Sequence, residues 1–305
     1  MTITKSLILL LVSSISAKRL FVGLNNAKYY YNYRMVSNLL AVSSKLQVLG
    51  IGGKNALTGN HVASFNHFAN FPPNTQRFED NEPKKNLLTS ESSFDFFNED
   101  VSLRRHLMAI SGRFDWDDPL NKRLDFRGAK SYFVYFTGHG GDLYMKIKYL
   151  EIFFARHFSD FFEDLFVSRK VPQAFVISDT CSAGTLFTTL KKDLVNAIFF
   201  GSSEWDSYSV SLGFDHFVGQ PIKDRFSYHF VKHLEVLAKN GGTMTHRQMM
   251  QKFDKSLIES TPLAFNYMKS NPDININEFF QDKPEPIVFD GLKNQQKEID
   301  DLFDN

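Results

Sequence analysis

Cysteine is nearly absent from this sequence of 305 residues, because Cys181 is its single cysteine. A disulfide bond within the chain is therefore excluded. In a protein that enters an oxidising compartment, one unpaired cysteine indicates either a bridge to another chain or a free, reactive thiol.

The chain also lacks an excess of charge of either sign, since 35 lysine and arginine residues face 34 aspartate and glutamate residues. Without a field of one sign, the composition gives no reason to expect nucleic acid as a partner. No Asn-x-Ser/Thr acceptor is present, so N-glycosylation gives no information on the compartment. What the chain binds must then be determined by a local site.

Long apolar runs are missing as well. A membrane-spanning helix needs roughly 20 apolar residues, and no segment reaches that length without charges. Near the N-terminus, the apolar residues 7–12 follow Lys5 and precede small residues that end at Ala17. This order is typical of a secretory signal peptide, which we predict for residues 1–17. A buried first strand is the alternative.

Short apolar runs alternate with helical patterns along residues 18–280, which we predict to form one domain. Strand-like runs occupy residues 20–24, 132–136, 174–177 and 197–200, and helical spacing occupies residues 33–49, 100–110, 144–167 and 225–238. This alternation indicates a mainly parallel sheet covered by helices. We expect a long irregular loop over the proline-containing residues 60–91 and a polar, mobile tail over residues 281–305.

Phenylalanine is concentrated in the expected helix over residues 144–167. Its apolar positions form one wide stripe: Phe153, Phe154, Phe158, Phe161, Phe162, Leu165 and Phe166. We interpret this stripe as core packing against a sheet face rather than as an aromatic binding site.

Two of the strand-like runs end in reactive residues. Thr-Gly-His-Gly-Gly at residues 137–141 follows one run, and Asp-Thr-Cys at residues 179–181 follows the next. In an open α/β sheet the carboxyl ends of the strands share the edge where ligands bind. A lone cysteine is often a small buried hydrophobe, but a thiol beside an imidazole is a nucleophile with its base. Together the two segments predict catalysis by Cys181 and His139.

Five segments, taken in order, resemble the legumain branch of the caspase-like cysteine peptidases, which includes the catalytic subunit of the glycosylphosphatidylinositol (GPI) transamidase. They are residues 31–34, 137–141, 179–181, 201–203 and 224–226. The Thr-Gly-His-Gly-Gly and Asp-Thr-Cys strings look like the transamidase subunit, because legumain endopeptidases typically have Asp-His-Gly and Glu-Ala-Cys there. The resemblance extends from residue 20 to about residue 230 and implies a three-layer α/β/α caspase-like sandwich around a mainly parallel sheet.

The resemblance also implies roles for individual residues. Cys181 would be the nucleophile, and His139 the general base and acid. Asn32 matches an asparagine proposed to orient the histidine, although it is also typical of a polar turn after the first strand. Backbone N–H groups of Gly140 and Cys181 would hold the oxyanion.

A substrate pocket is implied by the same resemblance. The positions that line the pocket for the residue before the scissile bond are Arg34, Asp179, Ser202, Ser203 and Asp224. Buried charges need compensation, so we expect Arg34 to pair with either Asp179 or Asp224. A purely structural ion pair is the alternative.

The sequence departs from the family pattern at several positions. Met35 replaces a usual histidine, Ser182 replaces a common glutamine, and residues 60–96 diverge. Of the carboxylates proposed to bind calcium in the family, only Asp95 has a plausible counterpart, so we expect neither a metal nor a cofactor. The cysteine that links the family's subunit to a partner has no counterpart here either.

The function that the resemblance implies is a cysteine-dependent transamidase. It would cleave a C-terminal GPI-attachment signal through a thioester and pass the new carboxyl end to the ethanolamine phosphate amine of a GPI lipid. It would act in the lumen of the endoplasmic reticulum, held by membrane subunits of a transamidase complex. A legumain-like asparaginyl endopeptidase and a non-catalytic scaffold subunit are the alternatives.

Overall fold

The computed structural model describes ten stretches of the chain: residues 18–28, 30–48, 61–63, 95–97, 101–120, 123–148, 150–215, 219–240, 243–269 and 271–280. The predicted signal peptide and C-terminal tail lie outside these residues, as does most of the expected irregular loop. Inside that loop, the structure forms one short strand at His61–Ala63.

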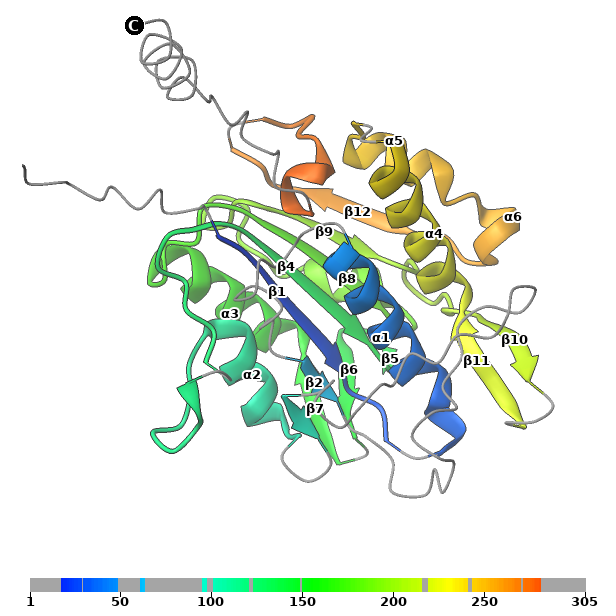
Figure 1. The fold of residues 1–305 in the computed structure, drawn as a ribbon, viewed down its shortest axis with the longest axis horizontal. Coiled ribbons are helices and arrows are strands. Elements are labelled where there is room, and N and C mark those ends of the chain that lie inside the picture. Colours follow the sequence, from blue (N-terminus) through cyan, green and yellow to red (C-terminus); the bar gives the residue numbers. More distant parts are fainter. Residues whose placement is uncertain are drawn as a thin grey trace, which may run out of the picture.

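A seven-stranded sheet forms the centre of the molecule, with the strand order β12-β9-β8-β4-β1-β2-β3 (Figure 1). The strands are β1 Lys18–Asn25, β2 His61–Ala63, β3 Phe96–Phe97, β4 Ala129–Thr137, β8 Ala174–Asp179, β9 Ala197–Gly201 and β12 Leu263–Asn266. All neighbouring pairs are parallel except β12 with β9. The prediction of a mainly parallel sheet is thus confirmed.

Helices cover both faces of this sheet. On one face, Phe133 and Tyr135 of β4 join the core formed with α1 (Tyr33–Val48) and α4 (Arg225–Asn240). On the other face, Tyr132 and Phe136 join the core formed with α2 (Leu103–Ser111) and α3 (Ala155–Val167). Alternate residues of a strand point to opposite faces, so a strand with helices on both sides is apolar throughout. The predicted three-layer α/β/α sandwich is confirmed (Figure 1).

The helix expected over residues 144–167 is wrong in its first half. A small antiparallel sheet occupies that region: β5 Gly140–Gly141, β6 Tyr144–Ile147 and β7 Glu151–Phe154. Met145, Ile147 and Phe153 are buried, whereas Lys146 and Ile152 are exposed. This alternation has the period of a strand, and the helical spacing begins only with α3.

The remaining elements lie between the strands of the sheet in the sequence or, for η6, after the last of them. They are the hairpin β10 Ser211–Asp215 and β11 Gln220–Asp224, the helices α5 His246–Lys252 and α6 Lys255–Ile258, and the 3-10 helices η1 Tyr30–Asn32, η5 Ala183–Phe187 and η6 Ile276–Phe279. Within the stretches that the structure describes, no helix has both the length and the apolar character to span a bilayer.

Phe158 lies at the centre of the aromatic core. Its ring is fully buried on α3. The ring centroids of five other phenylalanines lie between 4.5 and 6.1 Å from it: Phe136, Phe153, Phe162, Phe187 and Phe199. Most of the phenylalanine stripe is therefore core packing, and it fixes α3 against β4 and β9.

This packing predicts a large cost for removing the ring. Phe158→Ala should lower the free energy of unfolding by about 3–5 kcal/mol, because a cavity remains where five rings met. Val167→Ala, on the exposed side of the same helix, should change it by less than about 0.5 kcal/mol. Urea denaturation followed by circular dichroism measures both, and equal effects would contradict the central position of Phe158.

Candidate active site

The candidate catalytic residues follow two neighbouring strands in register. Thr137 of β4 pairs with Asp179 of β8, so His139 and Cys181 each come two residues after the same rung of the sheet. The backbone N–H of Gly138 donates to the Asp179 carbonyl oxygen at 3.3 Å. The structure therefore brings the two segments together at the carboxyl edge of the sheet, as the sequence predicted.

Glycine is required where the histidine segment leaves β4. A Cβ atom added to Gly138 would lie 1.4 Å from Oδ1 of Asn26, and one added to Gly140 would lie 2.4 Å from Oγ1 of Thr180. Both neighbours are buried. The glycines thus let the chain that carries His139 pass close to the segments after β1 and β8.

Asn32 contacts the imidazole directly. Its Oδ1 lies 2.7 Å from Nε2 of His139, and its Nδ2 donates to the carbonyl oxygen of Lys28 at 2.5 Å. Because the amide nitrogen is engaged by Lys28, Oδ1 faces the ring and Nε2 carries the proton. Nδ1 of His139 is then the nitrogen with a free electron pair. This geometry supports the orienting role, which stays a prediction.

Burial keeps both reactive groups neutral. It lowers the pKa of His139 to about 4, with a further contribution from the positive charges of Arg34 and Lys146. Burial also raises the pKa of Cys181, although a hydrogen bond from the Ser209 backbone opposes the rise. Near neutral pH the pair is consequently a thiol and a neutral imidazole. A neutral imidazole beside a thiol has the chemistry of a general base, and that role for His139 stays a prediction.

Ser202 and Ser203 hold the backbone on both sides of the cysteine. Oγ of Ser202 accepts from the N–H of Thr180 at 3.2 Å. Oγ of Ser203 donates to the Thr180 carbonyl oxygen at 2.8 Å and accepts from the N–H of Ala183 at 3.1 Å. Both serines are fully buried. Their hydroxyls are therefore bound to the Cys181 loop, and the place in a substrate pocket that the resemblance implies for both serines stays a prediction.

Arg34 selects Asp224 from its two expected partners. Nε of Arg34 lies 2.7 Å from Oδ1 of Asp224, and both side chains are largely buried. Nδ2 of Asn38 donates to the other carboxylate oxygen at 2.6 Å. Asn38 was missed in the sequence, although it lies one helical turn after Arg34 on α1.

Asp179 is held by hydroxyl groups instead of a cation. Ser209 donates to its Oδ1 at 2.6 Å, Ser227 donates to its Oδ2, and the Tyr135 hydroxyl lies 2.5 Å from the Ser227 oxygen. Burial and the nearby Asp224 raise the pKa of Asp179 to about 6. Burial also raises the pKa of Asp224, and Arg34 only partly opposes it. Nothing in the sequence pattern marked Ser209, Ser227 or Tyr135.

A metal site does not emerge from the part of the chain that the structure describes. Within those residues, no three His, Cys, Asp or Glu side chains are grouped so that they could hold an ion. Asp95 is among the described residues, but the segment before it is not. The absence of a metal stays a prediction.

Comparison with known proteins extends these observations. The model of the Peptidase C13 family matches residues 19–271. The chain is 26% identical to a GPI-anchor transamidase of Saccharomyces cerevisiae over 92% of its length, 26% identical to one of Schizosaccharomyces pombe over 85%, and 25% identical to one of Homo sapiens over 77%. It spans 65%, 68% and 59% of these relatives, respectively.

Among solved structures, caspase-1 from Spodoptera frugiperda is similar to this chain. The TM-score is 0.47 at 10% sequence identity, and the match covers 83% of this chain and 88% of the caspase chain.

The neutral state of the dyad can be tested through the reactivity of the thiol. Alkylation of Cys181 by iodoacetamide should rise with pH as one deprotonation above the usual range of a cysteine, because burial raises its pKa. His139→Ala should leave this profile unchanged. A plateau of fast alkylation near neutral pH that His139→Ala removes would show a preformed thiolate–imidazolium pair instead.

The role of Ser203 can be tested by stability. Ser203→Ala should lower the free energy of unfolding by about 1–3 kcal/mol, because the buried N–H of Ala183 loses its partner and the Thr180 carbonyl loses the shorter of its two hydrogen bonds. Ser44→Ala is the matched control, since the half-buried Ser44 hydroxyl donates only to a carbonyl of its own helix. If urea denaturation gave both variants the same small change, the hydroxyl of Ser203 would not hold the loop.

Proposed function

The chain belongs to the Peptidase C13 family, and from this premise we propose that it is a cysteine-type transamidase that attaches GPI lipids to proteins. The observation that carries the proposal is the in-register placement of His139 and Cys181 after β4 and β8, with Asn32 bound to the imidazole. The similarity to three GPI-anchor transamidases supports the choice of reaction.

The first half-reaction forms a thioester. Sγ of Cys181 attacks the carbonyl carbon of the residue to be lipidated, and Nδ1 of His139 takes the thiol proton. The same imidazole then gives that proton to the departing amine, which leaves with the C-terminal signal peptide. A histidine with a lowered pKa is a weak base but a strong proton donor once protonated, so it favours the departure of the amine.

Backbone N–H groups of Gly140 and Cys181 would hold the oxyanion of the tetrahedral intermediate. The strand pairing supports the part assigned to Gly140. The backbone N–H of Lys146 donates to the carbonyl oxygen of His139. Hydrogen-bonded and non-hydrogen-bonded pairs alternate along an antiparallel ladder, so the next pair, Gly140 with Met145, is a non-hydrogen-bonded one. The N–H of Gly140 consequently points away from β6.

The second half-reaction decides between transfer and hydrolysis. The amine of the ethanolamine phosphate attacks the thioester, the new amide forms, and the proton that the amine loses returns to the sulfur through His139. Water would give a free carboxylate by the same steps. The dyad does not distinguish these nucleophiles, so the outcome depends on which acceptor is positioned and on how well water is excluded.

Partner subunits would supply that positioning. We place the chain in the lumen of the endoplasmic reticulum, bound to membrane subunits of a transamidase complex by non-covalent contacts. The single thiol cannot both attack the substrate and form a disulfide bridge. Tethering to such subunits would raise the effective concentration of the lipid acceptor at the site.

The proposal predicts the result of replacing the nucleophile in cells. After depletion of the endogenous protein, wild type and the control Ser256→Ala, an exposed position on α6, should restore GPI-anchored proteins at the surface. Cys181→Ala should fold, because a small thiol is replaced by a methyl group, but it should leave uncleaved precursors that retain their C-terminal signal. Immunoblots of a GPI-anchored reporter measure both forms.

Two other results would contradict the proposal. Restored processing by Cys181→Ala would show a scaffold role. Normal anchoring after depletion, together with hydrolysis of asparaginyl peptides by the purified chain, would show a legumain-like endopeptidase.

A further inference from the structure

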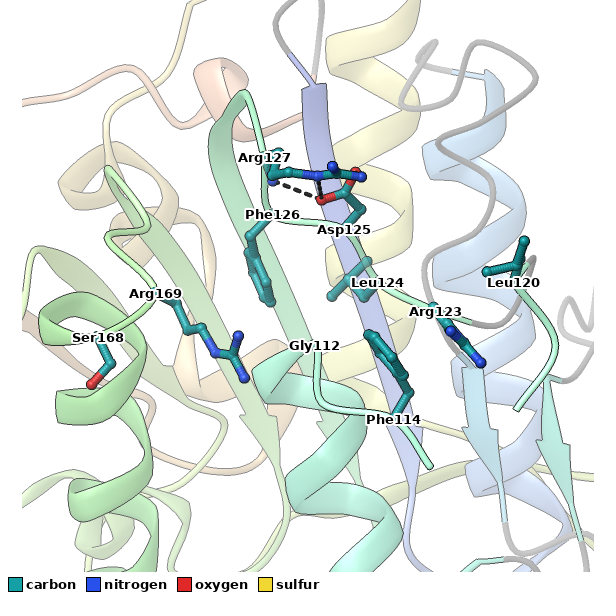
Figure 2. A pocket seen from close by; sticks show the side chains of 10 residues that line it. All are labelled: Gly112, Phe114, Leu120, Arg123, Leu124, Asp125, Phe126, Arg127, Ser168 and Arg169. Atoms are coloured by element: carbon teal, nitrogen blue, oxygen red, sulfur yellow. Dashed lines mark hydrogen bonds and ion pairs between the residues drawn. The ribbon is translucent and has the colours of Figure 1, made fainter. Parts of the chain in front are cut away.

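A cavity of about 660 Å³ lies beneath the connection from α2 to β4 (Figure 2). Arg127, on the wall of the cavity, comes two residues before β4 begins, and His139 comes two residues after β4 ends. The nine residues of β4 therefore separate the cavity from the catalytic edge. That length is about 30 Å. The residues that line the cavity are Gly112, Phe114, Leu120, Arg123, Leu124, Asp125, Phe126, Arg127, Ser168 and Arg169.

Arg105 and Arg123 anchor the loop in front of this cavity, which the structure describes over residues 113–120 and 123–128. Nε of Arg123 donates to the carbonyl oxygen of Asp118, and another nitrogen of its guanidinium donates to that of Trp116, both at 2.8 Å. The same guanidinium stacks on the ring of Phe114 at 4.3 Å. Arg105 of α2 binds the Asp118 carboxylate at 2.7 Å. The loop is therefore anchored by backbone and side-chain contacts.

This anchored loop nevertheless presents large apolar side chains to solvent. Trp116 is 90% exposed, Leu120 is 81% exposed and Phe114 is 46% exposed. Three large exposed apolar side chains within residues 114–120 of an anchored loop are typical of a surface that another molecule covers. Exposed tryptophan and leucine on one loop are also the composition of elements that enter the boundary between lipid headgroups and acyl chains.

The cavity behind the loop carries an excess of positive charge. Three arginines line it with one carboxylate, and that carboxylate belongs to Asp125, which binds Arg127 through two hydrogen bonds. Among the described residues, the guanidinium of Arg169 has no hydrogen-bond or ion-pair partner, and neither has the amino group of Lys170. Figure 2 shows Arg169 reaching from the end of α3 toward Gly112 and the ring of Phe126.

We propose that this cavity binds the phosphate group of an anionic phospholipid in a membrane surface, while Trp116 and Leu120 enter the adjacent apolar layer. A guanidinium matches the oxygen geometry of a phosphate. A free phosphate ion would engage the arginines but leave the exposed apolar loop uncovered. An amphiphile satisfies both, because a lipid places its phosphate and its acyl chains within several ångströms of each other.

The site is independent of the chemistry at Cys181. None of the lining residues belongs to the catalytic edge, and membrane binding can be measured without turnover. Failure of the lipid site would leave the proposed reaction intact, and failure of the reaction would leave the lipid site intact.

Vesicle flotation of the purified full chain tests the proposal. Wild type should float with phosphatidylcholine vesicles that contain phosphatidylserine, and much less with pure phosphatidylcholine. Arg169→Gln should weaken partitioning about fivefold, the effect of one cation near an anionic surface. Leu120→Ser should weaken it about tenfold, because one buried leucine side chain is lost from the apolar contact.

Two matched variants serve as controls on another part of the surface. Leu150→Ser changes a leucine that is 94% exposed in the turn between β6 and β7, and Arg156→Gln removes one exposed charge on α3. Both should partition as wild type does. All these proteins share the same N-terminal residues, so their differences report on the site, and circular dichroism verifies that each variant is folded.

Several results would overturn the proposal. One is the absence of binding to the anionic vesicles, and another is an equal loss in the Leu120 and Leu150 variants. Tight binding of inorganic phosphate without vesicle binding would identify a free anion as the ligand. If Trp116→Ser removed a co-purifying protein but left flotation unchanged, the surface would be a protein interface.

Discussion

The in-register parallel pairing of β4 with β8 is the interaction on which the candidate site depends. Side chains alternate between the two faces of a strand, so a slip by one residue would send either His139 or Cys181 away from the other. Helices cover both faces, and the alternation of Phe133 and Tyr135 with Tyr132 and Phe136 distributes each residue to its own core. The packing of the whole sandwich thus determines how the loops that carry His139 and Cys181 lie relative to each other.

Buried charge is the second constraint, and it acts on stability in two directions. The pKa of Asp179, raised to about 6 by burial and Asp224, means that the folded state binds a proton more tightly than the unfolded chain. This contribution to stability is lost as pH rises from about 4 through 6. The lowered pKa of His139, about 4 because of burial and positive neighbours, has the opposite effect, because its contribution to stability is lost as pH falls from about 6.5 through 4. The contributions of Asp179 and His139 to the pH dependence of stability therefore oppose each other.

Much of this arrangement could be predicted from the sequence, because parallel strands covered on both sides are continuous apolar runs that end in recognisable turns. The two reactive residues followed from such segments, whereas the contact of Asn32 with His139 was implied only by the family resemblance. The hairpin of β6 and β7 could not be separated from the following helix, because Phe153 and Phe154 fit both periods. The choice of Asp224 by Arg34 depends on how α1 packs beside β11, which no local pattern records. The hydrogen bonds of Ser202 and Ser203 arise only when the loops after β8 and β9 meet.

The order of strands in the sheet has a consequence for the newly made chain. β1 is synthesised first, but it pairs with β4, which is made far later, and pairings of such long separation are slow to form. The segment that carries Cys181, directly after β8, is made before the serines that hold its loop and before the helix that carries Ser227. During this interval the thiol is unprotected. Because the chain contains no other cysteine, it cannot be trapped in a wrong intramolecular disulfide while it waits for the rest of the sheet.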